Sequence, residues 1–302
     1  MRRLIAALAL AVAVLVVPAS PAGAAPAWVS SYELQIGADP ATVYLPPGRT
    51  ELPVALLLQG GNVPRESYGR FARTVAGFGF AVAVPDHRRA VGPVSGLYPE
   101  SAQLAATVTW AAQENTRAGS PLAGRLDADR LVLLGHSFGA AAGLFAAGNA
   151  CVPPFCFGPV YQRPAALRAA AFYGAATATQ GGPVVPVANA GVPVALVQGE
   201  VDGVNPPAAA RATYDGLSSP PKAYVTVHGA NHYGVTDTQT PAGALPDPSA
   251  QTVTQDASID ATARWSALFL RASLGDALAA AYVYGFGDGS DDSVTVVSVR
   301  GT

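Results

Sequence analysis

The stretch Leu131–Gly143, "LVLLGHSFGAAAG", passes from an apolar run into a run of small residues through a Gly-His-Ser-Phe-Gly motif centred on Ser137. The apolar run is typical of a buried strand, and the residues after it are compatible with a helix. Gly135 and Gly139 remove side chains where a sharp strand-to-helix turn would crowd the two elements. The pattern predicts that Ser137 is a nucleophile held on that turn, with its hydroxyl above the edge of a sheet.

The composition is that of a globular protein with a large core. The chain has 302 residues, of which 50% are hydrophobic and 13% charged, and its net charge is −2. These values exclude a disordered chain and give no basic excess for nucleic-acid binding. We expect a single domain over residues 25–302, with its core at about 43–273 and a C-terminal extension at about 275–302, and a monomer as the default state.

The N-terminus has the pattern of a secretory signal peptide. Arg2 and Arg3 precede the apolar run Leu4–Val17, and Ala22-Gly23-Ala24 has the small-residue form of a cleavage site. The alternative is a membrane anchor, but the run is shorter than the ~20 residues that a spanning helix needs. We therefore expect a signal peptide at 1–24, an extracellular mature protein and no stable membrane insertion after cleavage.

Cys151 and Cys156 are the only cysteines and enclose "VPPF". In a secreted protein such a pair predicts a disulfide, whereas two buried thiols are the alternative. The closed loop is short, so the bridge is expected to shape the segment at 150–163 more than to stabilise the fold.

Strand-length apolar runs alternate with helical patterns along the mature chain. The expected strands are 32–36, 41–45, 53–58, 80–84, 130–134, 168–172, 193–198 and 223–228, and the expected helices are 66–77, 100–117, 138–148, 206–216 and 258–273. The central strands are continuously apolar, which is typical of parallel strands covered by helices on both faces. The pattern predicts an α/β fold with a doubly wound, mostly parallel sheet, whose ligands bind at the C-terminal ends of the strands.

A serine nucleophile needs a base, and the base needs a carboxylate that orients it. Asp202 in "VALVQGEVDGVNPP" follows one expected strand, at the same edge as Ser137. Glu200 is the alternative acid, but it lies nearer the strand end. The order serine, acid, histidine along the chain is the one expected for this arrangement.

His232 in "YVTVHGANHYG" follows the next strand and is the expected base. His228 is the alternative, although it still belongs to the strand pattern. His136 lies inside the Ser137 motif and His87 precedes it, so neither is favoured.

A pair of backbone N–H groups must stabilise the oxyanion. The residue after the nucleophile, Phe138, supplies one. The loop "LLLQGGNVP" at 56–64 supplies the other, for which we favour Gly61 and then Asn62. The alternative for the two glycines of this loop is an ordinary turn.

The stretches "LLLQGGN", "GFAVAVPDHR", "GHSFGAAAG", "VQGEVDG" and "HGANHYG" make residues 43–273 resemble the α/β-hydrolases. Among these the chain is similar to secreted chlorophyllase-like, dienelactone-hydrolase-like and polyester-hydrolase-like serine esterases. The resemblance implies a catalytic triad of Ser137, Asp202 and His232. The chain departs from many relatives at Gln59, where they carry a His-Gly pair, and from dienelactone hydrolases in having serine instead of cysteine. The aromatic clamp of polyester hydrolases has no clear counterpart.

These features predict a secreted serine carboxylic-ester hydrolase that forms an acyl-enzyme and needs no metal or organic cofactor. The sequence does not distinguish among a small-molecule ester, a lipid, a chlorophyll-type pigment ester and a polyester as the substrate. An acyltransferase and a non-catalytic binding protein are the other function classes. The acidic "DGSDDS" at 288–293 lacks the ligand spacing of a calcium loop, so we expect a solvated surface turn there.

Two segments are expected to border the entrance of the site: the loop around the two cysteines and the loop from 233 to 252. Substrate-contacting candidates are Asn62, Phe155, Phe157 and Tyr173. The three aromatic residues are equally compatible with the core.

Overall fold

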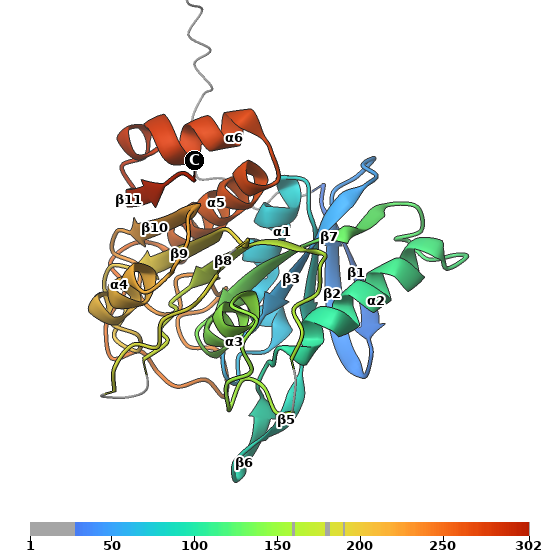
Figure 1. Cartoon of the computed structure of the whole chain (residues 1–302), viewed down its shortest axis with the longest axis horizontal. Coiled ribbons are helices and arrows are strands. Elements are labelled where there is room, and N and C mark those ends of the chain that lie inside the picture. The colour runs from blue at the N-terminus through green and yellow to red at the C-terminus, as the bar shows by residue number, and fades with distance from the viewer. Residues whose placement is uncertain (1–27, 159–160, 179–181, 190, 302) are drawn as a thin grey trace, which may run out of the picture.

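A large sheet flanked by helices forms the centre of the molecule (Figure 1). The computed structural model describes residues 28–158, 161–178, 182–189 and 191–301, so the expected signal peptide lies outside it. In the described part of the chain the sheet has nine strands in the order β1-β2-β4-β3-β7-β8-β9-β10-β11. Their bounds are β1 Ser30–Ile36, β2 Asp39–Leu45, β3 Leu52–Leu58, β4 Ala81–Pro85, β7 Leu126–His136, β8 Leu167–Tyr173, β9 Val194–Gly199, β10 Lys222–Val227 and β11 Val294–Val299.

Most neighbouring strands of this sheet are parallel. The run from β4 through β3, β7, β8 and β9 to β10 is parallel throughout, whereas β1 with β2, β2 with β4, and β10 with β11 pair antiparallel. The expected α/β class with a mostly parallel sheet is therefore confirmed.

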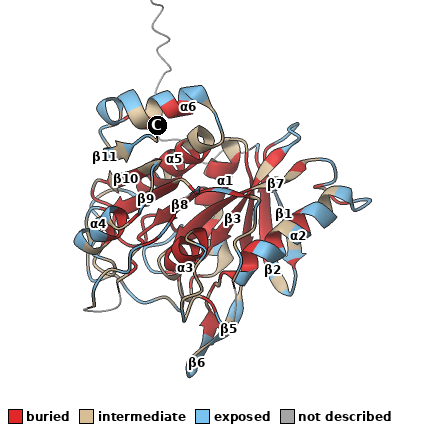
Figure 2. Ribbon diagram, in the orientation of Figure 1, coloured by how far each residue is buried: buried red, intermediate tan, exposed pale blue. Residues whose placement is uncertain are grey.

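Helices cover both faces, which is why the central strands carry apolar residues on both faces. Leu57 belongs to the hydrophobic cluster that includes residues of α1 (Gly69–Gly77) and α5 (Gln255–Ser273). Its neighbours Leu56 and Leu58 belong to the other cluster, which includes residues of α2 (Ala102–Thr116), α3 (Phe138–Ala147) and α4 (Pro207–Asp215). Figure 2 shows the buried strands between these two layers.

The chain leaves β3 and β7, which are neighbours, toward opposite sides. β3 leads through the 3₁₀ helix η1 (Arg65–Tyr68) and α1 to β4, whereas β7 leads through α3 to β8. Because α1 and α3 pack on opposite faces, the loops after these two strands diverge at the C-terminal edge of the sheet, which is where open α/β sheets bind their ligands. The loop at 59–64 and Ser137 lie at this edge.

Two parts of the fold were not expected from the sequence. The strands β5 (Arg88–Val91) and β6 (Val94–Leu97) form a separate hairpin joined by Gly92 and Pro93. The C-terminal extension forms α6 (Ala277–Ala281), a π-helical turn η2 (Tyr282–Phe286) and a 3₁₀ turn η3 (Asp288–Ser290), and then adds β11 to the edge of the same sheet. These elements are short, so they carry little periodicity.

The acidic segment at 288–293 is only partly the solvated turn that we expected. Residues 288–290 are exposed, but Asp291 accepts hydrogen bonds from Arg264 at 2.6 Å and from Trp265 at 2.8 Å. The expectation is wrong for Asp291, because its carboxylate anchors the extension to two side chains of α5.

Within the described ranges, no single helix combines the length and the apolar character needed to cross a bilayer. Taken together, α5 and the helical segment Ala277–Phe286 meet the length and composition expected of a membrane span, but they are bent by 117° relative to each other.

Candidate functional site

Ser137 occupies the sharp turn between β7 and α3. Its backbone has φ +53° and ψ −116°, a conformation that costs an L-residue about 1–3 kcal/mol. The two motif glycines make the turn possible. A β-carbon at Gly135 would lie 2.9 Å from Phe172 Cδ1, and one at Gly139 would lie 2.2 Å from the carbonyl oxygen of Leu58. Side chains at either position would push the helix off the sheet.

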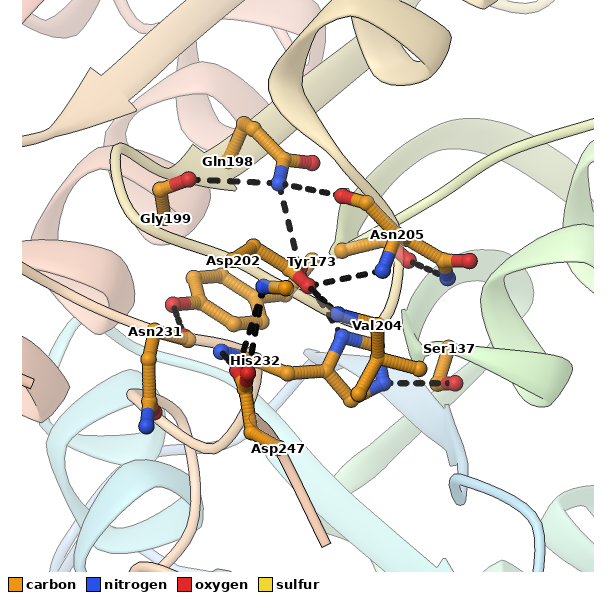
Figure 3. A network of polar contacts seen from close by, with 12 residues as sticks. Ser137, Tyr173, Gln198, Gly199, Asp202, Val204, Asn205, Asn231, His232 and Asp247 are labelled. Atoms are coloured by element: carbon orange, nitrogen blue, oxygen red, sulfur yellow. Dashed lines mark hydrogen bonds and ion pairs between the residues drawn. The ribbon is translucent and has the colours of Figure 1, made fainter. Parts of the chain in front are cut away.

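Ser137, His232 and Asp202 form one chain of hydrogen bonds (Figure 3). His232 Nε2 lies 2.8 Å from Ser137 Oγ, and His232 Nδ1 lies 2.8 Å from Asp202 Oδ2. An ionised carboxylate only accepts hydrogen bonds, so in the neutral imidazole the proton is on Nδ1 and Nε2 is free to accept from the hydroxyl. The side chains of His232 and Asp202 are 2% and 0% exposed, which keeps water away from this pair.

The carboxylate of Asp202 is held by further donors. Oδ1 accepts the backbone N–H groups of Val204 at 3.0 Å and Asn205 at 2.8 Å. Oδ2 accepts the amide of Gln198 at 3.1 Å beside the His232 bond. Donors on both oxygens leave the carboxylate one orientation, which the ring of His232 then follows.

The alternative acid and bases have partners elsewhere. Glu200 is exposed and accepts the N–H of Gly229 at 2.7 Å. His228 contacts the carbonyl of Asp292 and the hydroxyl of Thr295, and His87 pairs with Asp39. These contacts occupy Glu200, His228 and His87 outside the chain of Ser137, His232 and Asp202.

Asp247, which the sequence analysis did not identify, connects the two loops that carry Asp202 and His232 (Figure 3). Its carboxylate accepts the backbone N–H of His232 at 2.7 Å and that of Gly203 at 3.2 Å. It also accepts the N–H of Ser249 at 2.7 Å within its own loop. The long loop at 236–252 is irregular, and through Asp247 it braces the site.

The two expected oxyanion donors lie next to each other. A β-carbon at Gly61 would be 3.7 Å from Phe138 Cβ. Gly60 donates to Tyr68 and Asn62 donates to the carbonyl of Leu97, but the N–H of Gly61 has no acceptor among the described residues. Phe138 is the first residue of α3, so its N–H has no partner within the helix. Gly61 therefore fits the role better than Asn62.

Three aromatic side chains and one arginine lie beside these donors. We call them the entrance cluster: Tyr98, Phe138, Phe155 and Arg89. The Phe138 ring is 5.2 Å from that of Tyr98 and 4.8 Å from that of Phe155, measured between centroids. Arg89 Cζ lies 5.9 Å from the centroid of Phe138. All three rings are partly exposed, so they can contact a ligand.

The four expected substrate contacts fall into different places. Phe155 belongs to the entrance cluster, and Phe157 is 59% exposed with Arg89 stacked on its ring at 5.6 Å. Asn62 binds the hairpin instead: its Oδ1 accepts the N–H of Leu97 and its Nδ2 donates to the hydroxyl of Tyr98.

The expectation of a substrate contact is wrong for Tyr173. Its side chain is 2% exposed, and its hydroxyl donates to the carbonyl of Asn231. Burial raises the pKa of this phenol well above its usual value, so the hydroxyl stays a neutral donor. Tyr173 supports the His232 loop from within the core.

The expected disulfide between Cys151 and Cys156 is present. The loop that it closes is tied to the entrance cluster, because Arg89 donates to the carbonyl of Pro154 at 2.7 Å. The carbonyl of Phe155 accepts the N–H of Ser101, the residue before α2, at 3.0 Å. The bridge therefore closes a loop that packs against the entrance.

In the described ranges no group of three or more His, Cys, Asp and Glu side chains is arranged to hold a metal ion. Comparison with models of known protein families gives no match, and no curated protein matches the chain in sequence. What the structure defines is an α/β protein with a large, mostly parallel sheet flanked by helices. A buried chain of Asp202, His232 and Ser137 lies at the C-terminal edge of that sheet.

Proposed function

We propose that this protein is a secreted serine carboxylic-ester hydrolase with an α/β-hydrolase fold. The observation that carries the proposal is the chain of 2.8 Å contacts from Asp202 through His232 to Ser137 Oγ. A strained serine beside two unpaired N–H groups is the second feature that such a reaction needs. The resemblance of the motifs around these residues to secreted serine esterases supports the same class.

In the first half of the reaction, Ser137 Oγ attacks the ester carbonyl while His232 Nε2 takes the hydroxyl proton. Asp202 holds the imidazole and stabilises the positive charge that forms on it. The negative charge on the carbonyl oxygen is received by the N–H groups of Gly61 and Phe138. Collapse of the tetrahedral intermediate expels the alcohol, which takes its proton from His232, and leaves an acyl group on Ser137.

In the second half, water replaces the alcohol. His232 takes a proton from water as it attacks the acyl-enzyme, the same two N–H groups receive the oxyanion, and the acid leaves as Ser137 regains its proton. The entrance cluster is where the acyl or alcohol portion of the ester would contact aromatic surface. The attack by water on the acyl-enzyme distinguishes a hydrolase from an acyltransferase, because an acyltransferase would pass the acyl group to an alcohol.

The test is the rate of hydrolysis of p-nitrophenyl esters from acetate to palmitate by the wild type and Ser137→Ala. Loss of the nucleophile should lower turnover on the order of 10⁶-fold. Ser120→Ala is the matched control, because its buried hydroxyl bonds Glu114 away from the site. Activity of Ser137→Ala within tenfold of the wild type would contradict the proposal. A fluorophosphonate probe that fails to label folded wild type would favour a binding protein, and acyl transfer to an added alcohol in preference to water would favour an acyltransferase.

His232→Ala should be nearly inactive, and His228→Ala should retain most activity. His232 is the group that takes the serine proton in this reaction, so its removal leaves the hydroxyl without a base. The reverse ranking of the two variants would show that the base has been assigned wrongly.

A further inference from the structure

A second histidine, His136, lies buried beneath the site and has no part in the reaction described above. Its side chain is 1% exposed, and its ring centroid is 4.8 Å from that of His232. Its Nε2 lies 2.9 Å from the backbone carbonyl oxygen of His232, and its Nδ1 lies 3.0 Å from Tyr68 Oη. The fully buried Tyr68 hydroxyl also accepts the N–H of Gly60 at 2.8 Å.

The chemistry of these groups fixes every proton in the chain. A carbonyl oxygen only accepts, so the proton of His136 is on Nε2 and points at the carbonyl of His232. Nδ1 is then an acceptor, which requires Tyr68 to donate its hydroxyl proton to it. The lone pairs of the hydroxyl remain for the N–H of Gly60. The result is a single directed path from Gly60 through Tyr68 and His136 to His232.

We propose that Tyr68 and His136 are positioning residues that set the oxyanion donor and the catalytic base relative to each other. One end of the path is the N–H of Gly60, the residue before the proposed oxyanion donor Gly61. The other end is the backbone carbonyl of His232. The inference rests on the proposed function, since it concerns the geometry of that reaction. The two ends come from loops after β3 and β10, which are not neighbours in the sheet.

The surroundings keep this path in one state. Burial lowers the pKa of His136 well below its ordinary value of 6.5, and the neighbouring His232 lowers it further, so the ring stays neutral. Burial raises the pKa of Tyr68, so its hydroxyl keeps its proton. The packing is tight, because a β-carbon at Gly60 would lie 2.7 Å from His136 Nδ1. A shift of His136 would therefore displace the loop before Gly61.

Three variants separate the two halves of the path. Tyr68→Phe removes the hydroxyl and leaves the N–H of Gly60 and Nδ1 of His136 without partners. His136→Gln places its amide nitrogen near the position of Nε2 and keeps the bond to His232, but it loses the acceptor for Tyr68. His136→Asn places its amide near Nδ1 and loses the contact with His232. Tyr224→Phe is the control, because it removes one buried hydroxyl that donates to Pro207 on α4.

We expect Tyr68→Phe and His136→Gln each to lower kcat about ten- to hundredfold with little change in KM, because misplacement by about 1 Å costs that much. Since both break the same contact, the double variant should be no slower than the slower single variant. His136→Asn should not recover the loss. Tyr224→Phe should lower Tm without changing kcat. If Tyr68→Phe lowers only Tm, or if the two effects on kcat multiply, the positioning role is wrong.

Imidazole ¹⁵N NMR gives a readout that needs no activity, and the chain has only four histidines to assign. His136 should stay neutral with its proton on Nε2 from pH 5 to 9, also in Ser137→Ala, and its Nδ1 resonance should move in Tyr68→Phe. A proton on Nδ1, or titration within this range, would overturn the inference. Active Ser137→Ala would sink the proposed function, whereas inactive Ser137→Ala beside fully active Tyr68→Phe would sink the positioning role alone.

Discussion

The loops after β9 and β10 and the entrance cluster lie around Ser137 at the same edge of the sheet but are built in opposite ways. Asp202 and His232 are almost completely buried, and both oxygens of Asp202 receive two donors. Tyr98 and Phe155 are partly exposed and contact their neighbours mainly through rings. The first region holds one geometry, because a lost hydrogen bond there leaves a buried polar group that costs about 1–3 kcal/mol.

This difference separates two kinds of mutational effect. Changes in the buried polar region should slow the hydrolysis of every ester by a similar factor, since the same proton transfer serves all of them. Changes at the entrance should alter the ratio of rates between esters, since apolar contacts there discriminate among acyl or alcohol groups. Four variants test this separation, and a pH series then tests the burial of His136.

Asp202→Asn should have the largest effect, lowering kcat by about 10⁴-fold for every ester. The amide nitrogen cannot accept a hydrogen bond from His232 Nδ1, so the imidazole would carry its proton on Nε2 and could not take the serine proton. Glu200→Gln is the control, because the exposed Glu200 carboxylate accepts the N–H of Gly229, outside the chain of Ser137, His232 and Asp202. Comparable losses in both variants would show that the buried pair is not the acid and base of the reaction.

Asp247→Asn should lower kcat about ten- to hundredfold with the ratios between esters unchanged. The neutral amide accepts the N–H groups of His232 and Gly203 more weakly than the carboxylate does. The matched control is Asp276→Asn, whose carboxylate caps α6 by accepting Leu278 and Ala279. Steady-state kinetics across the ester series measure the effect. Changed ratios would move Asp247 to the entrance side of the comparison.

Tyr98→Ala should change the ratio of long-chain to short-chain rates by about three- to tenfold, while the rate for the acetate ester changes little. The hydroxyl of Tyr98 is held by Asn62, and its ring contacts Phe138 beside the proposed oxyanion donors. Phe286→Ala is the control, since this exposed ring lies in the C-terminal extension. Constant ratios would remove Tyr98 from substrate selection.

Replacing both Cys151 and Cys156 by serine should change these ratios by a smaller factor, about two- to threefold. The bridge would act on the substrate indirectly, through Phe155 and through the Arg89 contact with Pro154. The assay is run at a temperature where circular dichroism shows the variant folded. Identical ratios would limit the disulfide to stability, and the loop at 236–252 would then be tested alone.

The last prediction concerns stability and not the rate of reaction. The pKa of His136 is lowered in the folded protein, so the unfolded chain binds more protons below the ordinary value of 6.5. Stability from this group is present above pH 6.5 and is lost as pH falls below it, by at most about 1.4 kcal/mol per pH unit. Urea denaturation of the wild type and His136→Gln between pH 7.5 and 5 measures it. An equal acid sensitivity of both proteins would contradict the assignment.

Features that depend on neighbouring residues in the sequence could be predicted, whereas features that depend on distant residues could not. The strands, the main helices and the placement of Ser137, Asp202 and His232 at strand ends follow from local patterns, because parallel strands bring their C-terminal ends to one edge. The hairpin β5–β6 had one usable signal, the Gly92-Pro93 dipeptide. Asp247, Gln198 and Tyr68 had none, because each acts through a partner that only folding brings near.

The amino-acid sequence alone was enough for the α/β class, the order of most elements and the short-range disulfide. Hydrophobic periodicity, glycine at a turn and cysteine spacing are properties of neighbouring residues, so they can be read before the chain folds. Only the tertiary structure decided that Tyr173 is a core residue, that Asp291 is an anchor and that Asp247 and His136 brace the site. The partners of these residues lie 26 to 96 positions away in the sequence, or in two different loops. Burial and hydrogen bonding therefore depend on which segments the sheet places together.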